Sequence, residues 1–302
     1  MAKKLITRIK GGLGNQLFCY AAARRLAIAN QAELIIDDVS GFTYDLAYKR
    51  KYALDVFQIP VKKASYWERM EPLGRWRRKF LRLISLRHPL CRQYYILQEG
   101  VRFDPEILSL NLNREVTYFD GFGQSEDYFS DIEGVLRQDL IFKPPQDKKN
   151  QAMALEIHTS ESVAVHVRWF DFDEKNSGSR ASDEYYRNAL AEIRNRVSSP
   201  HLFIFSDQAK ETAQRFRALT LDMKVTYVTH NQNEDVAYAD LWLMSMCKHF
   251  VIANSTFSWW GAWLGERKGL SLVYAPKLVV RPANNVTAWG FKNLLPSRWN
   301  LL

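Results

Sequence analysis

Residues 163–171 read Val-Ala-Val-His-Val-Arg-Trp-Phe-Asp, an apolar run that ends in charged side chains. Its β-branched character predicts a buried strand. Side chains alternate along a strand, so His166 and Arg168 are expected on one face. In open α/β sheets, ligands bind beyond the carboxyl ends of the strands, where the planar guanidinium of Arg168 suits an anion such as a diphosphate. Taken alone, the residues favour a plain ion pair between Arg168 and Asp171.

From residue 151 onward, the sequence alternates between helical and strand-like segments. The expected strands cover residues 163–168, 201–205, 224–228, 250–253 and 270–274. This alternation predicts an α/β fold in which helices cover both faces of a parallel sheet. Polar pairs end three of the strands: Arg168 with Asp171, Ser206 with Asp207, and Asn254 with Ser255. Because the carboxyl ends of parallel strands lie at one edge of a sheet, these residues are expected to form one site.

The N-terminal half opens with a strand, a glycine loop, a helix and a second strand, which is the order of a βαβ unit. The loop reads Gly11-Gly12-Leu13-Gly14 and leads into Asn15. Glycines allow close backbone approach and a helix N-terminus attracts anions, so Gly12 and Gly14 are candidate ligand contacts; a plain tight turn fits them equally. Asn15 either binds the ligand or caps the helix. The spacing differs from the G-x-G-x-x-G fingerprint, which leaves a nicotinamide-dependent oxidoreductase as a weaker alternative.

Length and punctuation indicate two domains. The chain has 302 residues, and residues 142–149 carry two prolines among several charges, which makes them the best candidate boundary. We therefore expect one domain over residues 1–150 and a second over residues 151–302.

Charge and cysteine content limit which binding partners and which cellular compartment fit the protein. The formal net charge of +9 fits an anionic ligand, a nucleic acid or an anionic membrane surface. The sequence contains no known nucleic-acid-binding motif, which argues against nucleic acid. The three cysteines form no Cys-x-x-Cys pair, and neither a signal peptide nor a membrane span is evident. A cytoplasmic protein is therefore expected.

Two segments of the N-terminal half have more than one interpretation. Residues 41–70 are rich in aromatic side chains, which pack in a core or stack on sugar rings. Residues 75–92 are basic, and Trp76, Phe80 and Leu83 recur there at helical spacing. A solvated helix face is the favoured interpretation of this helix, and contact with an anionic membrane or a partner is the alternative.

The strand ends carry chemistry that suits an anionic ligand. Asn254, Ser255 and Thr256 open a tryptophan-rich helix, where hydroxyl and amide groups suit an N-cap or a phosphate. Asp207 is suited to accept two N–H groups of a purine or to pair with a lysine. Residues 171–173 read Asp-Phe-Asp, a pattern that holds divalent metals in other folds, but no histidine or cysteine cluster accompanies it. No metal site is therefore expected.

The combined motifs resemble the inverting, GDP-fucose-dependent α-1,2-fucosyltransferases of bacteria. The residues that carry the resemblance are 11–18 (Gly-Gly-Leu-Gly-Asn-Gln-Leu-Phe), His166-Val167-Arg168 with Asp171, Phe205-Ser206-Asp207, and 254–264 (Asn-Ser-Thr-Phe-Ser-Trp-Trp-Gly-Ala-Trp-Leu). The family pattern His-x-Arg-Arg-Gly-Asp is altered here, because Trp169 and Phe170 replace Arg-Gly.

The resemblance implies a GT-B-like fold, with two Rossmann-like domains that face a central cleft, and a transfer that needs no metal or other cofactor. L-Fucose would pass from GDP-β-L-fucose to the 2-hydroxyl of a terminal β-galactoside on an oligosaccharide or a lipid-linked glycan; an α-1,3 or α-1,6 linkage is the alternative. Arg168 would stabilise the leaving diphosphate, and Asp171 is the first candidate for the base. The other donor contacts would be Gly12, Gly14, Asn15, His166, Ser206, Asp207, Asn254, Ser255, Thr256 and Phe257.

Overall fold

The computed structural model describes residues 3–46, 48–169, 180–220, 222–231, 234–278 and 289–302. The chain divides into two compact units. Unit 1 contains Met1–Phe142 and Lys292–Leu294, and unit 2 contains Lys143–Phe291 and Leu295–Leu302. The division after Phe142 falls within the proline-bearing stretch, somewhat before residue 150. The sequence pattern did not indicate that Lys292–Leu294 belong to unit 1.

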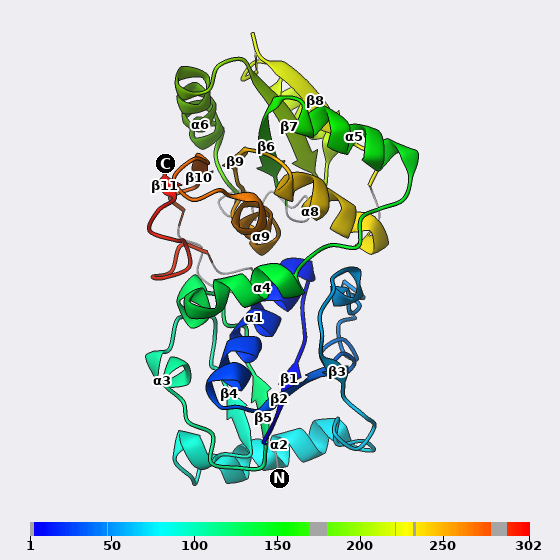
Figure 1. The fold of residues 1–302 in the computed structure, drawn as a ribbon, viewed down its shortest axis with the longest axis vertical. Coiled ribbons are helices and arrows are strands. Elements are labelled where there is room, and N and C mark those ends of the chain that lie inside the picture. Colours follow the sequence, from blue (N-terminus) through cyan, green and yellow to red (C-terminus); the bar gives the residue numbers. More distant parts are fainter. Residues whose placement is uncertain (1–2, 47, 170–179, 221, 232–233, 279–288) are drawn as a thin grey trace. The chain divides into compact units, whose positions relative to one another are not determined.

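Unit 1 is built on a five-stranded parallel sheet with the strand order β3-β2-β1-β5-β4 (Figure 1). Its strands are β1 (Lys4–Arg8), β2 (Glu33–Asp37), β3 (Lys62–Lys63), β4 (Tyr95–Leu97) and β5 (Val116–Asp120). Its α-helices are α1 (Leu13–Ala29), α2 (Gly74–Ser85), α3 (Pro105–Leu108) and α4 (Glu133–Asp139). The predicted opening of strand, helix and strand is present. Strands β3 and β4 are too short to show a sequence period.

Unit 2 contains a six-stranded parallel sheet with the order β11-β10-β9-β6-β7-β8. Its strands are β6 (Glu161–Val167), β7 (Pro200–Ser206), β8 (Lys224–Val228), β9 (His249–Val251), β10 (Val273–Ala275) and β11 (Asn300–Leu301). Its α-helices are α5 (Lys148–His158), α6 (Asp183–Arg196), α7 (Ala209–Phe216), α8 (Ala237–Ser245) and α9 (Thr256–Gly265). The predicted alternation of helices and strands is confirmed, and β8 and α9 have the expected bounds.

The central strand β6 separates two layers of unit 2. Val163, Val165 and Val167 pack with α6 and α7 in one hydrophobic core. The alternate residue His166 points to the other face, where its ring lies 5.7 Å from that of Phe257 in α9. The tryptophans of α9 are fully buried, so they form part of the core of unit 2. No helix among the described residues is long and apolar enough to cross a membrane.

Each sheet has one point at which the strand order reverses. In unit 1 this point lies between β1 and β5, and in unit 2 it lies between β6 and β9. Ligands of open parallel sheets bind beyond the carboxyl ends of the strands at such points. The glycine loop follows β1 and Arg168 follows β6. Both sequence motifs therefore lie at the positions that the topology favours for ligands.

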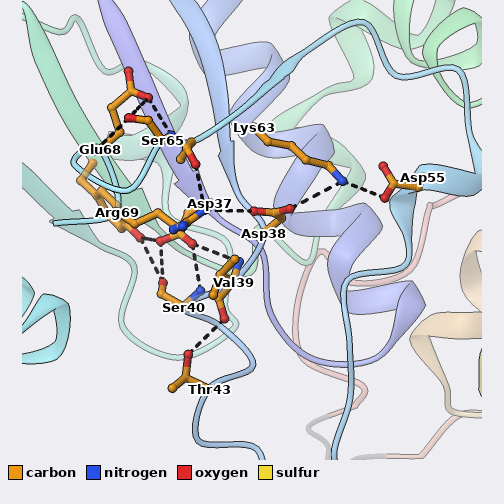
Figure 2. Close-up of polar contacts among 12 residues, drawn as sticks. Asp37, Asp38, Val39, Ser40, Thr43, Asp55, Lys63, Ser65, Glu68 and Arg69 are labelled. Carbon is orange, nitrogen blue, oxygen red and sulfur yellow. Dashed lines mark hydrogen bonds and ion pairs between the residues drawn. The ribbon is translucent and has the colours of Figure 1, made fainter. Parts of the chain in front are cut away.

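The carboxyl edge of the unit 1 sheet holds a polar network (Figure 2). Asp37 ends β2 and accepts hydrogen bonds from the Ser40 hydroxyl at 2.6 Å and the Ser40 amide at 2.9 Å. The ammonium of Lys63 lies 3.5 Å from Asp38 and 2.7 Å from Asp55. These contacts fix the loop that follows β2.

Asp120, at the end of β5, pairs with two cations at this edge. It is 3.0 Å from Arg8 Nη1 and 2.5 Å from Lys10 Nζ, and it accepts a hydrogen bond from the Tyr95 hydroxyl at 2.6 Å. Burial alone would raise the pKa of Asp120, but the two cations and the hydrogen bonds lower it to about 2. The carboxylate is therefore charged throughout the physiological range.

Replacing Asp120 by Asn should destabilise unit 1 by about 3 kcal/mol at neutral pH, because two largely buried cations would lose their counter-charge. The folded pKa lies below the unfolded value, so the contribution is complete above about pH 4 and is lost as the pH falls toward 2. Urea unfolding followed by circular dichroism should show a shallower acid dependence for Asp120→Asn than for the wild type. Tyr95→Phe keeps all three charges and should retain the acid dependence; equal slopes for wild type and Asp120→Asn would contradict the assignment.

Candidate functional site

One carboxylate joins the ends of β6 and β7. Asp207 Oδ2 lies 3.1 Å from Arg168 Nη1, and Asp207 Oδ1 accepts the backbone N–H of Trp169 at 3.0 Å. The partner of Asp207 is thus an arginine rather than the lysine considered from the sequence. The Arg168 side chain is 37% exposed, so its guanidinium is held in place and is still accessible to a ligand.

His166 lies beside this pair as a buried, neutral group. Burial, reinforced by the charge of Arg168, lowers the pKa of His166 to about 3. Its backbone carbonyl accepts a hydrogen bond from the Tyr186 hydroxyl at 2.9 Å. Its Nδ1 atom is buried and has no hydrogen-bond partner among the described residues. A nitrogen in this setting is suited to a hydrogen bond with a ligand.

The junction of β9 and α9 brings a helix N-terminus to the same sheet edge. Ser255 is the N-cap of α9, and its hydroxyl accepts the backbone N–H of Phe257 at 3.3 Å. Asn254 is buried directly before it, and Thr256 begins the helix. The predicted N-cap is present, and the first amides of α9 lie at the reversal point of the sheet, where they favour an anion.

Ser206, the last residue of β7, contacts the start of α7. Its hydroxyl is 2.8 Å from Thr212 Oγ1 and accepts the backbone N–H of Gln208 at 3.1 Å. Thr212 Oγ1 also accepts the indole N–H of Trp169 at 2.7 Å. Ser206 therefore helps to fix the loop after β7 and the position of Trp169.

Trp169 occupies the place of the second arginine in the pattern His-x-Arg-Arg-Gly-Asp. Its side chain packs against the core under α6 and α7. The guanidinium groups of Arg180 and Arg215 lie 5.1 Å and 5.2 Å from the centre of its ring. The position is apolar, but two cationic side chains are stacked against it.

A pocket of about 240 Å³ lies at the carboxyl end of β8. It is formed by the N-terminal end of α5, the loop after β8 and the start of α8; its lining residues are Pro145, Asp147, Lys149, Asn150, His230, Asn231, Val236, Tyr238 and Ala239. Asn150 and Asn231 exchange hydrogen bonds in both directions, at 2.9 Å and 3.0 Å. Because the helices of an α/β unit return antiparallel to its strands, this pocket lies at the same sheet edge as Arg168.

Asp240 in α8 adds a titratable group behind this pocket. Burial raises the pKa of Asp240 to about 7, and a hydrogen bond from Asn231 Nδ2 at 2.8 Å opposes the rise. A carboxyl group that titrates near neutral pH beside a pocket is a candidate ligand contact. In the sequence, Asp240 is recognisable only as an acid between the apolar residues Ala237 and Met244.

The glycine loop of unit 1 is a tight connection into α1. Gly11 has φ +78°, and a Cβ atom there would lie 2.9 Å from the Asn15 side-chain nitrogen. Gly12 is the N-cap position of α1, and Gly14 is buried in the first turn. Asn15 does not cap the helix; its side-chain oxygen Oδ1 accepts a hydrogen bond from Gln124 Nε2 at 2.8 Å.

Gln16, which the sequence marked only as a member of the motif at residues 11–18, fixes this loop. Its buried side-chain amide donates to the carbonyls of Gly11 at 2.9 Å and Lys51 at 2.8 Å. It also accepts the backbone N–H of Ala53 at 2.8 Å. The glycine loop is thereby tied to the segment that follows residue 50.

The expected site residues thus fall into two groups. Gly12, Gly14 and Asn15 belong to unit 1, and the carboxyl edge of unit 2 carries His166, Arg168, Ser206, Asp207, Asn254, Ser255, Thr256 and Phe257. Asp171 lies outside the described residues. Within the described ranges, no group of three or more His, Cys, Asp or Glu side chains is arranged to hold a metal.

Residues 90–279 match the family model described as glycosyl transferase family 11. The chain belongs to this family. The family 11 enzyme is 28% identical over 286 residues to an alpha-1,2-colitosyltransferase of Escherichia coli, a match that covers 90% of this chain and 91% of the relative. It is 25% identical over 297 residues to the O-antigen biosynthesis glycosyltransferase WbnK of Escherichia coli, with 91% and 92% coverage.

Solved structures establish the fold of this glycosyltransferase. NodZ alpha-1,6-fucosyltransferase co-crystallized with GDP matches with a TM-score of 0.53 at 16% identity, covering 86% of this chain and 92% of NodZ. A mutant of Arabidopsis thaliana FUT1 in complex with GDP matches with a TM-score of 0.54 at 11% identity, covering 98% and 75%. The expected GT-B-like α/β fold, with a parallel sheet in each half, is thus confirmed.

Gly11→Ala should destabilise the family 11 enzyme by about 1–2 kcal/mol, because the substitution forces alanine into the left-handed region. Gly134→Ala in α4 is the matched control; a Cβ atom there meets nothing within 4 Å, and helix propensity should give a gain of about 0.5–1 kcal/mol. Urea unfolding of both variants measures the difference. Equal effects of the two substitutions would show that the loop does not require its glycine.

Proposed function

We propose that this enzyme transfers L-fucose from GDP-β-L-fucose to the 2-hydroxyl of a terminal β-galactoside, with inversion and without a metal. The observation that carries the proposal is the Arg168 guanidinium, held by Asp207 at the reversal point of the unit 2 sheet. The names of the relatives support it, since one is an alpha-1,2-colitosyltransferase and a similar structure was soaked with GDP-fucose.

The leaving group decides which charges the site must supply. Cleavage of the sugar–phosphate bond places negative charge on GDP and oxocarbenium-like positive charge on the sugar. A fixed guanidinium and the first amides of α9 are suited to stabilise the departing diphosphate, and donors of this kind contribute roughly 3 kcal/mol each. No metal is needed for this charge balance.

The pocket beside β8 is suited to the base of the nucleotide. Guanine presents two adjacent N–H donors, at N1 and at the 2-amino group, and one carboxylate accepts both. Both oxygens of Asp207 contact the residues that follow β6, Arg168 and Trp169, whereas Asp240 lies behind the pocket and shares Asn231 with its wall. We therefore assign guanine recognition to Asp240 and the positioning of Arg168 to Asp207.

Acceptor, linkage and compartment belong to the same proposal. The acceptor is a galactose-terminated oligosaccharide or lipid-linked glycan, and Asp171 is the proposed base that takes the proton of its hydroxyl. The three free cysteines fit a cytoplasmic enzyme.

GDP-colitose is the second candidate donor, because one relative is named an alpha-1,2-colitosyltransferase. NodZ is named an alpha-1,6-fucosyltransferase, so a different linkage is the competing outcome.

Arg168→Ala should lower kcat by about 100-fold or more while the protein stays folded, since one fixed donor to the leaving diphosphate is removed. Purified enzyme is incubated with GDP-fucose or GDP-colitose and a panel of galactosides, with and without EDTA, and the product linkage is read by NMR. Arg187→Ala, an exposed arginine of α6, is the matched control and should behave as wild type. Turnover of Arg168→Ala close to that of wild type would remove the proposed mechanism.

Asp240→Asn should weaken GDP binding about tenfold at alkaline pH, because a charged acceptor of two N–H groups becomes a neutral amide. The pKa of about 7 means that wild-type Asp240 becomes charged as the pH rises through neutrality. Its affinity for GDP should therefore rise over that range, and the affinity of Asp240→Asn should stay nearly constant. Calorimetric titrations with GDP and with ADP measure both effects, and Asp235→Asn, an exposed acid nearby, serves as the control. Parallel pH profiles for wild type and Asp240→Asn would contradict this assignment.

A further inference from the structure

The helix α2 turns its apolar side toward solvent. Trp76, Phe80 and Leu83 recur at i, i+4 and i+7 on one face of the helix, and they are 67%, 63% and 56% exposed. The opposite face carries the buried residues Gly74 and Ser85. This is the reverse of an ordinary surface helix, which packs its apolar stripe on the core. The outer side of α2 is a solvated face, as the favoured interpretation expects, but it carries the apolar stripe as well as the charges.

Polar contacts hold α2 in this orientation. On the inner face, Arg78 Nη1 donates to the carbonyl of Arg69 at 2.8 Å. The Ser85 hydroxyl accepts the backbone N–H of Tyr95 in β4 at 3.0 Å. Leu81 packs against the unit 1 core that contains Tyr95. Rotation of the helix to bury Trp76 would break all of these contacts, so the outward apolar stripe is built into the fold.

The margins of the apolar stripe are cationic. Among the 12 residues of α2, Arg75, Arg77, Arg78, Lys79 and Arg82 are basic and none is acidic. At 100° per residue, Arg77 lies on one side of the stripe, and Arg75 and Lys79 lie on the other. The Lys79 ammonium is 5.9 Å from the centre of the Trp76 ring, so cation and aromatic face lie together. Long cationic side chains beside exposed aromatic and aliphatic groups are suited to bind a layered surface. Its outer layer would be negatively charged and the layer beneath would be apolar.

We propose that the α2 surface, defined by Trp76, Phe80 and Leu83 with Arg75, Arg77 and Lys79, binds an anionic lipid bilayer. The helix lies parallel to the membrane, its apolar side chains enter the boundary between headgroups and acyl chains, and its cations contact lipid phosphates. Charge selects this occupant over a second copy of the chain, because two molecules of net charge +9 would bring two basic helices together. The inference does not depend on the donor or on the linkage formed.

Flotation of the full-length protein with lipid vesicles tests this surface. Wild type should float with vesicles that contain phosphatidylglycerol, float poorly with pure phosphatidylcholine, and lose binding as salt is raised. Trp76→Ser/Phe80→Ser/Leu83→Ser should reduce vesicle binding at least about tenfold. Arg75→Gln/Arg77→Gln/Lys79→Gln should remove the preference for anionic lipid. Leu155→Ser/Leu270→Ser changes two leucines of unit 2 that are 65% and 73% exposed, and this control should bind as wild type does.

Two further measurements separate the outcomes. Circular dichroism melts should be unchanged in the triple serine variant, since its three side chains are exposed, and transfer to a water-soluble acceptor should also be unchanged. Vesicle binding without fucosyl transfer would overturn only the proposed function, and transfer without vesicle binding would overturn only the membrane surface. Failure of wild type to float with anionic vesicles at low salt, or equal flotation of the triple serine variant, would overturn the inference. Self-association that the serine variant abolishes, seen by ultracentrifugation without vesicle binding, would assign α2 to a second copy.

Discussion

The unit 2 site depends on the carboxylate of Asp207, which binds two donors that directly follow β6. An ion pair with side chains 37% and 24% exposed contributes about 1 kcal/mol or less to stability. The main effect of the pair is to fix the position of the Arg168 guanidinium. The second oxygen of Asp207 binds the backbone of Trp169, so the strand end and the guanidinium are fixed by the same group. A cation that is already in place when a diphosphate departs needs no reorganisation, and this is the condition under which such groups accelerate reactions most.

Much of the fold was predictable from local periodicity, because long strands and helices bury regular stripes. The β-branched run of β6 and the tryptophan-rich helix α9 each needed no information from elsewhere in the chain. Strands β3 and β11 have two residues each, and a pair of residues shows no period. The orientation of helix α2 was not predictable in this way. Its amphipathic pattern was visible, but the side that packs inward is set by Arg69 and Tyr95, and periodicity contains no information about those contacts.

The candidate site divides in the same way. Polar residues that interrupt an apolar run at a strand end are visible in the sequence, and Arg168, Asp207 and Ser255 were found by that signal. Asp240 was missed because its pKa is raised by burial, which results from the packing of α8 rather than from its neighbours in sequence. Gln16 was missed for a related reason: its bonds reach Lys51 and Ala53, across a segment without a regular pattern.

Because Trp169 replaces the second arginine of the family pattern, this motif has one positive charge fewer with which to neutralise a diphosphate. An indole does not neutralise a diphosphate, and this one donates its N–H to Thr212 and packs on the core. Arg215 stacks on it but also pairs with Asp183 and donates to the carbonyl of Ala181, so its charge is partly compensated where it lies. The motif itself therefore supplies one charged donor, the Arg168 guanidinium. The first backbone amides of α9 supply uncharged N–H donors. A buried, neutral His166 fits this arrangement, because a positive charge on His166 would be repelled by the Arg168 guanidinium.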